Sequence, residues 1–290
     1  MMQKLKRIVI IILGLILLLV IGGAIVFYVG MKPYRQLVDS WVFKENQVGP
    51  VIGDLGGISV SIPQSIAKFV EYEGDPHFLE PRKGSTPTRT FQSKLRAFGF
   101  EVRFPDMAFL NNEAAKEDYR KSNIYNTMWL GVGVLVDPYN NNVGLKRMVN
   151  AIPAPGKIWT SNLDGQPHTW KEQNGYIRSS KPLYGLVVNE VQGYDEAKRY
   201  KIPGNDILDA NIYYHSDNNG KINAYIKCGN IKHDAAPCDH YFILPTTQDT
   251  MIEVNYRIGL LPKWREIQDS VGKAILGFSV EPNNSNPITL

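Results

Sequence analysis

The strongest constraint on this chain is an uncharged apolar run, IVIIILGLILLLVIGGAIVFYV, that extends from Ile8 to Val29. A helix of about 20 such residues spans the hydrocarbon core of a bilayer. A cleaved signal peptide is the competing interpretation, but its apolar core usually has only about 7–15 residues. Here the small residues Gly22, Gly23 and Ala24 are followed by further apolar sequence. The run therefore predicts an uncleaved transmembrane signal anchor over residues 8–29.

Charge around this run predicts its orientation. Residues 1–35 contain no Asp or Glu but carry Lys4, Lys6, Arg7, Lys32 and Arg35. Basic residues are retained on the cytoplasmic side, so the three before the run favour a cytoplasmic N-terminus and a periplasmic C-terminal domain. The rest of the chain holds 27 Lys and Arg against all 28 Asp and Glu. The net charge of +4 and the pI near 8.8 thus come from the anchor, and they do not indicate nucleic-acid binding.

The two cysteines, Cys228 and Cys238, lie between the strand-like stretches INAYIK and HYFIL. Neighbouring strands can bring two such residues within bridging distance. If the domain is exported, its compartment is oxidising and the disulfide persists. The spacing therefore predicts a disulfide. Zinc is the alternative, because His233 and His240 lie in the same stretch, but C-x4-H-x4-C-x-H matches no common zinc spacing.

Hydrophobic periodicity predicts an α+β fold with predominantly antiparallel sheets. Alternating stretches indicate strands in GISVSIP, AKFVEYEG (with Phe69 and Tyr72 in the core), LRAFGFEVRF and MIEVNYRI. MWLGVGVLVDP is nearly all apolar, which is typical of a strand buried on both faces, and LKRMVNAI, KIWTSN and WKEQNGYIRS are shorter strand candidates. DANIYYHS and KINAYIKC flank Asp217-Asn218-Asn219-Gly220, a hairpin signal.

Two helices are predicted as well. Asn112 is a candidate cap for a helix through Glu113–Lys121, and Trp264, Ile267 and Val271 begin an amphipathic C-terminal helix that should pack on the sheet. We therefore expect five parts: a basic end and anchor (1–31), an approach broken by Pro and Gly (32–56), two α+β regions (57–180 and 181–280) and a flexible tail (281–290).

No catalytic motif stands out. The sequence lacks H-E-x-x-H, G-x-S-x-G, a P-loop and a G-x-G-x-x-G that opens a helix. Gly131 and Gly133 lie within a strand and indicate close packing, and the Asp137 turn lacks the pattern of a calcium loop. No spacing singles out a pair among the carboxylates Asp54, Glu71, Glu73, Asp75 and Asp106. We therefore expect no enzyme, catalytic residue, metal or cofactor.

Several stretches in this order resemble membrane-anchored bacterial proteins encoded beside type VI secretion effectors, especially antibacterial lipases. They are GDLGGISVSIPQSIAKFVEYEGDPHF, RTFQSKLRAFGFEVRFPDM, KPLYGLVVNE, NAYIKC, PCDHYFIL and YRIGLLPKWREIQDSVGKAILGF. The resemblance spans roughly residues 50–280. It implies an immunity protein that blocks a cognate toxin in the periplasm, without catalytic residues to carry over.

Two other classes stay open: a non-enzymatic envelope scaffold tethered to the inner membrane, and a periplasmic hydrolase. The partner-binding residues are not identified by the sequence. Candidate surfaces are exposed strand edges, the basic segment from Arg82 to Arg103 and the 229–237 loop between the cysteines.

Overall fold

The computed structural model describes residues 49–76, 87–136, 144–152, 158–163, 166–171, 176–191, 210–230, 233–247 and 250–281, with backbone alone for 158–163, 166–171 and Val191. The chain divides into two compact units, Met1–Val48 and Gly49–Leu290, and every described residue belongs to the second. The predicted anchor, the approach up to residue 48 and the tail from residue 282 lie outside the described residues. Within the described ranges, no helix is long and apolar enough to cross a membrane.

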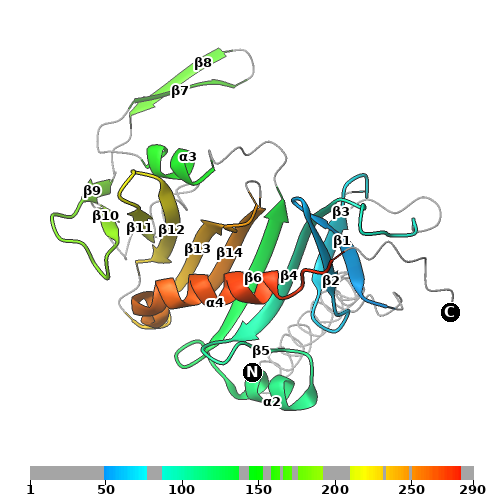
Figure 1. The fold of residues 1–290 in the computed structure, drawn as a ribbon. Coiled ribbons are helices and arrows are strands. Elements are labelled where there is room, and N and C mark those ends of the chain that lie inside the picture. The colour runs from blue at the N-terminus through cyan, green and yellow to red at the C-terminus, as the bar shows by residue number, and fades with distance from the viewer. Residues whose placement is uncertain are drawn as a thin grey trace, which may run out of the picture. The chain divides into compact units, whose positions relative to one another are not determined.

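A ten-stranded antiparallel sheet forms the centre of the second unit (Figure 1). Its order is β3-β4-β6-β14-β13-β12-β11-β10-β9, and the short β5 pairs with β4. Strands from both the 57–180 and the 181–280 regions are neighbours, because β6 pairs with β14. The bounds are β3 Lys68–Tyr72, β4 Leu95–Arg103, β5 Ala108–Phe109, β6 Trp129–Val136, β9 Tyr176–Arg178, β10 Val187–Val191, β11 Ala210–Ser216, β12 Ile222–Gly229, β13 Pro237–Ile243 and β14 Thr250–Arg257.

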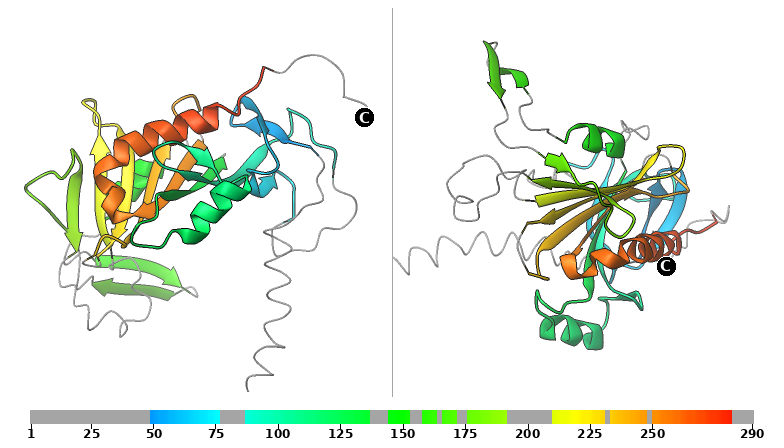
Figure 2. Two further views of the ribbon diagram at one scale, coloured as in Figure 1. Left: turned by 90° about the horizontal axis from the view of Figure 1, so that it is seen from below. Right: turned by 90° about the vertical axis from the view of Figure 1, so that its left-hand side faces the viewer.

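The C-terminal helix α4 (Trp264–Leu276) crosses one face of this sheet (Figures 1 and 2), after the 3-10 helix η3 (Ile258–Lys263). Its residues Trp264, Ile267, Val271 and Ile275 are buried, as their spacing predicts. Each large apolar side chain that is fully buried stabilises the fold by about 1.5–3 kcal/mol. The buried strand residues that face it occupy every second position, and they include Phe98, Phe100, Val102, Val132, Val134, Ile252, Val254 and Tyr256. An antiparallel α+β fold with a C-terminal helix is thereby confirmed.

Two hairpins lie outside the main sheet: β1 (Val51–Leu55) with β2 (Ile58–Ile62), and β7 (Ile158–Leu163) with β8 (Gln166–Lys171). The glycines of the predicted approach were expected to break regular structure as far as residue 57, and this expectation was wrong for β1. Gly56 and Gly57 have φ of +59° and +95°, so they form the tight turn between β1 and β2. The hairpin contacts both the main sheet and the end of α4, through Asp54 N to Ser93 O (2.8 Å) and Ser61 N to Phe278 O (2.9 Å).

The stretch LKRMVNAI was predicted as a strand, but it forms most of helix α3 (Gly144–Asn150) and the turn after it. Leu145, Met148, Val149 and Ile152 recur at three and four residues, and they pack together against the face of the sheet opposite α4. This spacing places all four on one side of a helix, whereas in a strand they would divide between two faces.

Two predictions of burial were wrong. Strand β6 is buried on its α4 side, but on its other face burial is limited to Trp129, because Gly131 and Gly133 are partly exposed and Leu135 is 41% exposed. Phe69 was expected in the core beside Tyr72, but it is 61% exposed, whereas Tyr72 is buried. Phe69 lies where the β3–β4 register shifts and has φ of +50°, so its side chain leaves the alternation of the strand.

Candidate functional site

The two cysteines are joined. Cys228 and Cys238 are directly paired on β12 and β13, with an S–S distance of 2.02 Å, and both are fully buried. The predicted disulfide is therefore present, and it uses the sulfurs that a zinc site would need. Among the described residues, no group of three or more His, Cys, Asp or Glu is arranged to hold a metal ion.

The described histidines lie in three separate environments. His215 contacts Asn223, Arg265 and Trp264, and His233 lies beside Tyr125. His240 is fully buried beneath α4, where its Nε2–H donates to Gln268 Oε1 (3.2 Å) and its Nδ1 lies 3.3 Å from the hydroxyl of Tyr256. Burial lowers the pKa of His240 from 6.5 to about 3, so this imidazole is neutral and structural. The other two histidines, His77 and the His168 side chain, lie outside the described residues.

The basic segment does not form a free cationic face in its described part. Arg89 pairs with Asp75 at 2.5 Å, Lys94 pairs with Asp54, and Arg103 pairs with Asp106 (2.6 Å) and Asp118 (3.0 Å). Three of the five carboxylates considered as catalytic candidates, Asp75, Asp54 and Asp106, therefore each have a basic partner of their own. Arg82 and Lys83 lie outside the described residues.

A helix and a loop stand at the end of the sheet where β4 ends and β6 begins. Helix α2 (Glu113–Lys121) is capped by Asn112, whose side chain accepts a hydrogen bond from Ala115 N, as predicted. Ala115 is the buried residue of this helix, and Figure 2 (right) shows α2 standing clear of the sheet. Asp118 accepts from both Arg103 and the Trp129 indole (3.0 Å each), so a charged network fixes the helix.

The loop after α2, residues 122–128, is held by side chains that bond to backbone. Asn123 Oδ1 accepts from Tyr125 N, and Asn126 Oδ1 accepts from Asn123 N, both at 2.9 Å. The Thr127 carbonyl accepts from Arg257 Nε of β14 at 3.1 Å. Asparagine side chains stabilise turns in this way. The bonds fix a loop whose apex carries Ile124 and Tyr125, which are 62% and 60% exposed.

The disulfide loop lies against this apex. The rings of Tyr125 and His233 have centroids 5.7 Å apart, and His233 Nδ1 accepts from Ala235 N at 3.1 Å. The loop is also bonded to the start of η3, through Ile258 N to Ala236 O at 2.7 Å. We call the exposed side chains of Tyr119, Ile124, Tyr125 and His233 the Tyr125 surface. It includes part of the 229–237 loop that the sequence proposed as a candidate.

Comparisons with protein-family models and with curated proteins find no match for this sequence. A similar solved structure is Smlt3025, an immunity protein of the Stenotrophomonas maltophilia type IV secretion system. It is 18% identical, the alignment covers 80% of this chain and 94% of that chain, and the TM-score is 0.47. A likeness of this degree carries no information about activity.

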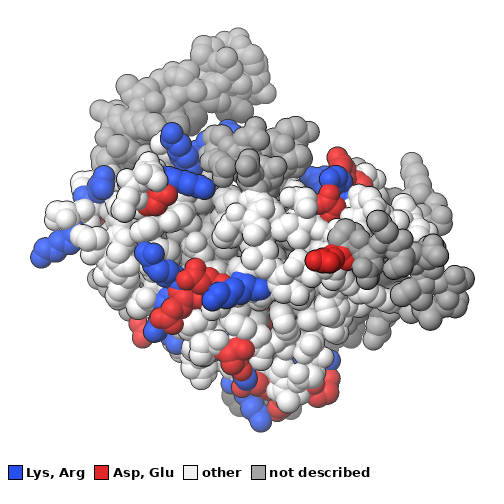
Figure 3. Space-filling view, in the orientation of Figure 1, with Lys and Arg blue, Asp and Glu red and all other residues white. Residues whose placement is uncertain are grey.

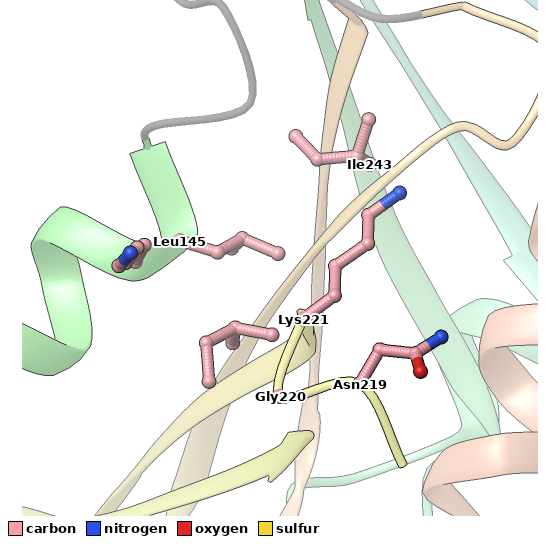
Figure 4. Close-up of a pocket in the computed structure, with 7 residues that line it drawn as sticks. Leu145, Asn219, Gly220, Lys221 and Ile243 are labelled. Atoms are coloured by element: carbon pink, nitrogen blue, oxygen red, sulfur yellow. The ribbon is translucent and has the colours of Figure 1, made fainter. Parts of the chain in front are cut away.

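A pocket of about 240 Å³ lies between α3 and the β11–β12 turn (Figure 4). Leu145 and Ile243 approach it from α3 and β13, and Lys146 and Lys221 are its charged residues. Among the described residues, no carboxylate, histidine or cysteine lines it, so this lining offers no pair of acid and base.

Sequence reasoning missed Ile124 and Tyr125. Both lie in KSNIYNTM, where two asparagines three residues apart flank large apolar side chains. Such a pattern is a signal for a structured turn. The disulfide loop lies close to Tyr125 because of the order of strands in the sheet, and no local sequence pattern shows that order.

Proposed function

We propose that this chain is a membrane-tethered immunity protein, which binds a cognate secreted toxin in the periplasm and occludes its catalytic cleft. The observation that carries the proposal is the Tyr125 surface, where two large apolar side chains are held in solvent by a hydrogen-bonded loop. Exposed hydrophobic clusters on otherwise ordinary surfaces mark interaction sites.

The geometry suits tight inhibition. A loop that is already ordered loses little conformational entropy on binding, so more of the contact energy contributes to affinity. Aromatic side chains near the centre of an interface supply much of its binding energy. A rigid tyrosine and isoleucine at the apex of a loop have the shape to enter an apolar cleft, and inhibition by occlusion requires no catalytic group on the inhibitor.

Sequence features support the location and the partner class. The run at residues 8–29 has the length of a membrane anchor, and a buried disulfide is typical of an oxidising compartment. The resemblance described above points to a toxin of the type VI secretion class, with a lipase as the proposed target. On this proposal the chain is an inhibitor and not an enzyme.

The test is to titrate the full chain, in nanodiscs, with the secreted toxin encoded by the adjacent gene. Ile124→Ala/Tyr125→Ala should weaken binding by about 30-fold or more, the effect of losing at least one interface hot spot. Both side chains are exposed, so the melting temperature should stay unchanged. The matched control is Leu135→Ala, which removes a similarly exposed aliphatic side chain on β6 and should bind as the wild type does.

The possible outcomes test the immunity function and the assignment of the docking surface separately. If no secreted toxin from the same locus binds the chain, the immunity function is wrong. Several stable membrane partners in place of a toxin would then favour the scaffold alternative. If a toxin binds with equal affinity to the wild type and the double variant, immunity stands and the Tyr125 surface is not the docking surface.

A further inference from the structure

A second exposed apolar cluster lies at the β9 edge of the main sheet, in the connection between β9 and β10. Leu183 and Leu186 exchange two backbone hydrogen bonds, of 3.0 and 2.8 Å, around the two-residue turn Tyr184-Gly185. The Trp264 indole, at the start of α4, donates to the carbonyl of Tyr184 at 3.0 Å. The tip formed by residues 181–186 is therefore fixed to the core.

The residue at the apex of this tip is unfavourable for the turn. Tyr184 and Gly185 have φ of +53° and +79°, the geometry for which Asn-Gly is the preferred pair. A bulky residue at positive φ is strained, and such strain is concentrated at functional positions. Tyr184 is nevertheless 50% exposed, beside Leu183 at 39% and Ile177 at 50%. The turn would therefore be more stable with asparagine at position 184, yet the chain has an exposed aromatic side chain there.

Basic residues surround the tip. Arg178 and Lys181 are exposed and make no ion pair with any described residue, and Arg265 stacks on Trp264 at 4.7 Å. Glu190, which is paired with Ile177 across the two strands, is an acidic residue close to them. Basic side chains project from the left-hand margin of Figure 3, over β9 and β10. Apolar side chains ringed by Lys and Arg are suited to the boundary between anionic headgroups and acyl chains.

The sequence keeps this tip within reach of a membrane. Residues 30–48 separate the apolar run from the folded unit, and fully extended they cover at most about 65 Å. Tethering over such a distance raises the effective concentration of the bilayer surface, so a weak contact becomes populated. We propose that the 181–186 tip docks on the anionic headgroups of the bilayer that holds the N-terminal run; this inference rests on the proposed membrane tether.

Hydrogen exchange of the full chain in nanodiscs tests the proposal without an added label. Discs of phosphatidylcholine alone are compared with discs that also contain phosphatidylglycerol. Each basic residue near an anionic surface strengthens attraction about five-fold, so Arg178 and Lys181 together predict up to about 25-fold slower exchange at the tip in the anionic discs. Arg178→Gln/Lys181→Gln should abolish the difference, and the 122–128 loop should exchange equally in both discs.

Tyr184→Asn provides the matched variant. It creates the preferred Asn-Gly turn, so the melting temperature should be equal or higher, while the slowing in anionic discs should be smaller than in the wild type because the exposed ring is lost and only the two basic residues remain. Equal exchange of the wild-type tip in both discs would overturn the proposal. So would slowing that appears only when an acidic protein or the toxin is added, or failure of the chain to stay in the discs. Toxin neutralisation is not part of this readout, so loss of immunity in a separate assay would leave the membrane contact standing.

Discussion

The fully buried imidazole of His240 makes the stability of this fold depend on pH in a predictable direction. The ring is neutral in the folded state because burial lowers its pKa to about 3, whereas in the unfolded chain it titrates near 6.5. Below pH 6.5 the unfolded chain therefore binds a proton that the folded chain excludes. The stability that is linked to His240 is fully present above pH 6.5, and it is lost progressively as the pH falls from 6.5 towards 3.

The magnitude at pH 5 depends mainly on the unfolded value, provided that the folded pKa lies well below 5. Moving 1.5 pH units below the unfolded value costs about 2 kcal/mol, with a slope of about 1.4 kcal/mol per pH unit. A loss of this size is a large fraction of a typical stability of about 5–15 kcal/mol. In acidic surroundings this protein would therefore lose a substantial part of its stability through one side chain.

Urea denaturation at intervals from pH 7.5 to 4.5 measures this dependence, and His240→Gln is the variant to compare. Glutamine does not titrate, so the curve of the variant should be flatter by the slope given above, whatever its absolute stability. Asp106 and Glu113, whose pKa values are lowered by Arg103 and Lys116, contribute equally to both proteins. Parallel curves for the two proteins would refute the assignment of the acid sensitivity to His240.

Two further predictions concern the core. Cys228→Ala/Cys238→Ala should lower the free energy of unfolding by about 2–3 kcal/mol, from the loop of eleven residues that the bond closes; an unchanged urea midpoint under oxidising conditions would contradict this. Ile267→Ala, at the fully buried centre of α4, should cost about 2–5 kcal/mol, whereas Asp269→Ala on the exposed side of α4 should change the midpoint by about 0.5 kcal/mol or less. Similar losses for these two variants would mean that α4 does not pack as described.

Elements with a regular local pattern were predicted well from the sequence. The alternation in LRAFGFEVRF and MIEVNYRI identified β4 and β14, and the Asp217–Gly220 turn identified the β11–β12 hairpin. The stripe beginning at Trp264 identified α4. In each of these elements burial follows a period of two or of about 3.6 residues, so the pattern is complete within a few turns or pleats.

The errors arise where local sequence is ambiguous or where distant contacts decide. The α3 stretch is short, and its apolar residues fit a helix better than the strand that was predicted. Phe69 is turned outward by a register shift against β4, which the sequence of β3 does not show. The pairing of β6 with β14 joins residues more than 110 positions apart, and the approach of Tyr125 to His233 follows from that order. Local sequence patterns therefore could not predict the Tyr125 surface.

The β1–β2 hairpin determines how this unit carries mechanical load. A pull transmitted along the chain to Gly49 first strains β1, which is bonded to β2 along its length and to Ser93 beside β4. β2 is in turn bonded on both sides of Val60 to the segment that follows α4, through Ser61 N to Phe278 O and Val280 N to Ser59 O, each at 2.9 Å. Tension that enters at β1 is therefore shared with the segment that follows α4, so the folded unit resists being unfolded from its first strand.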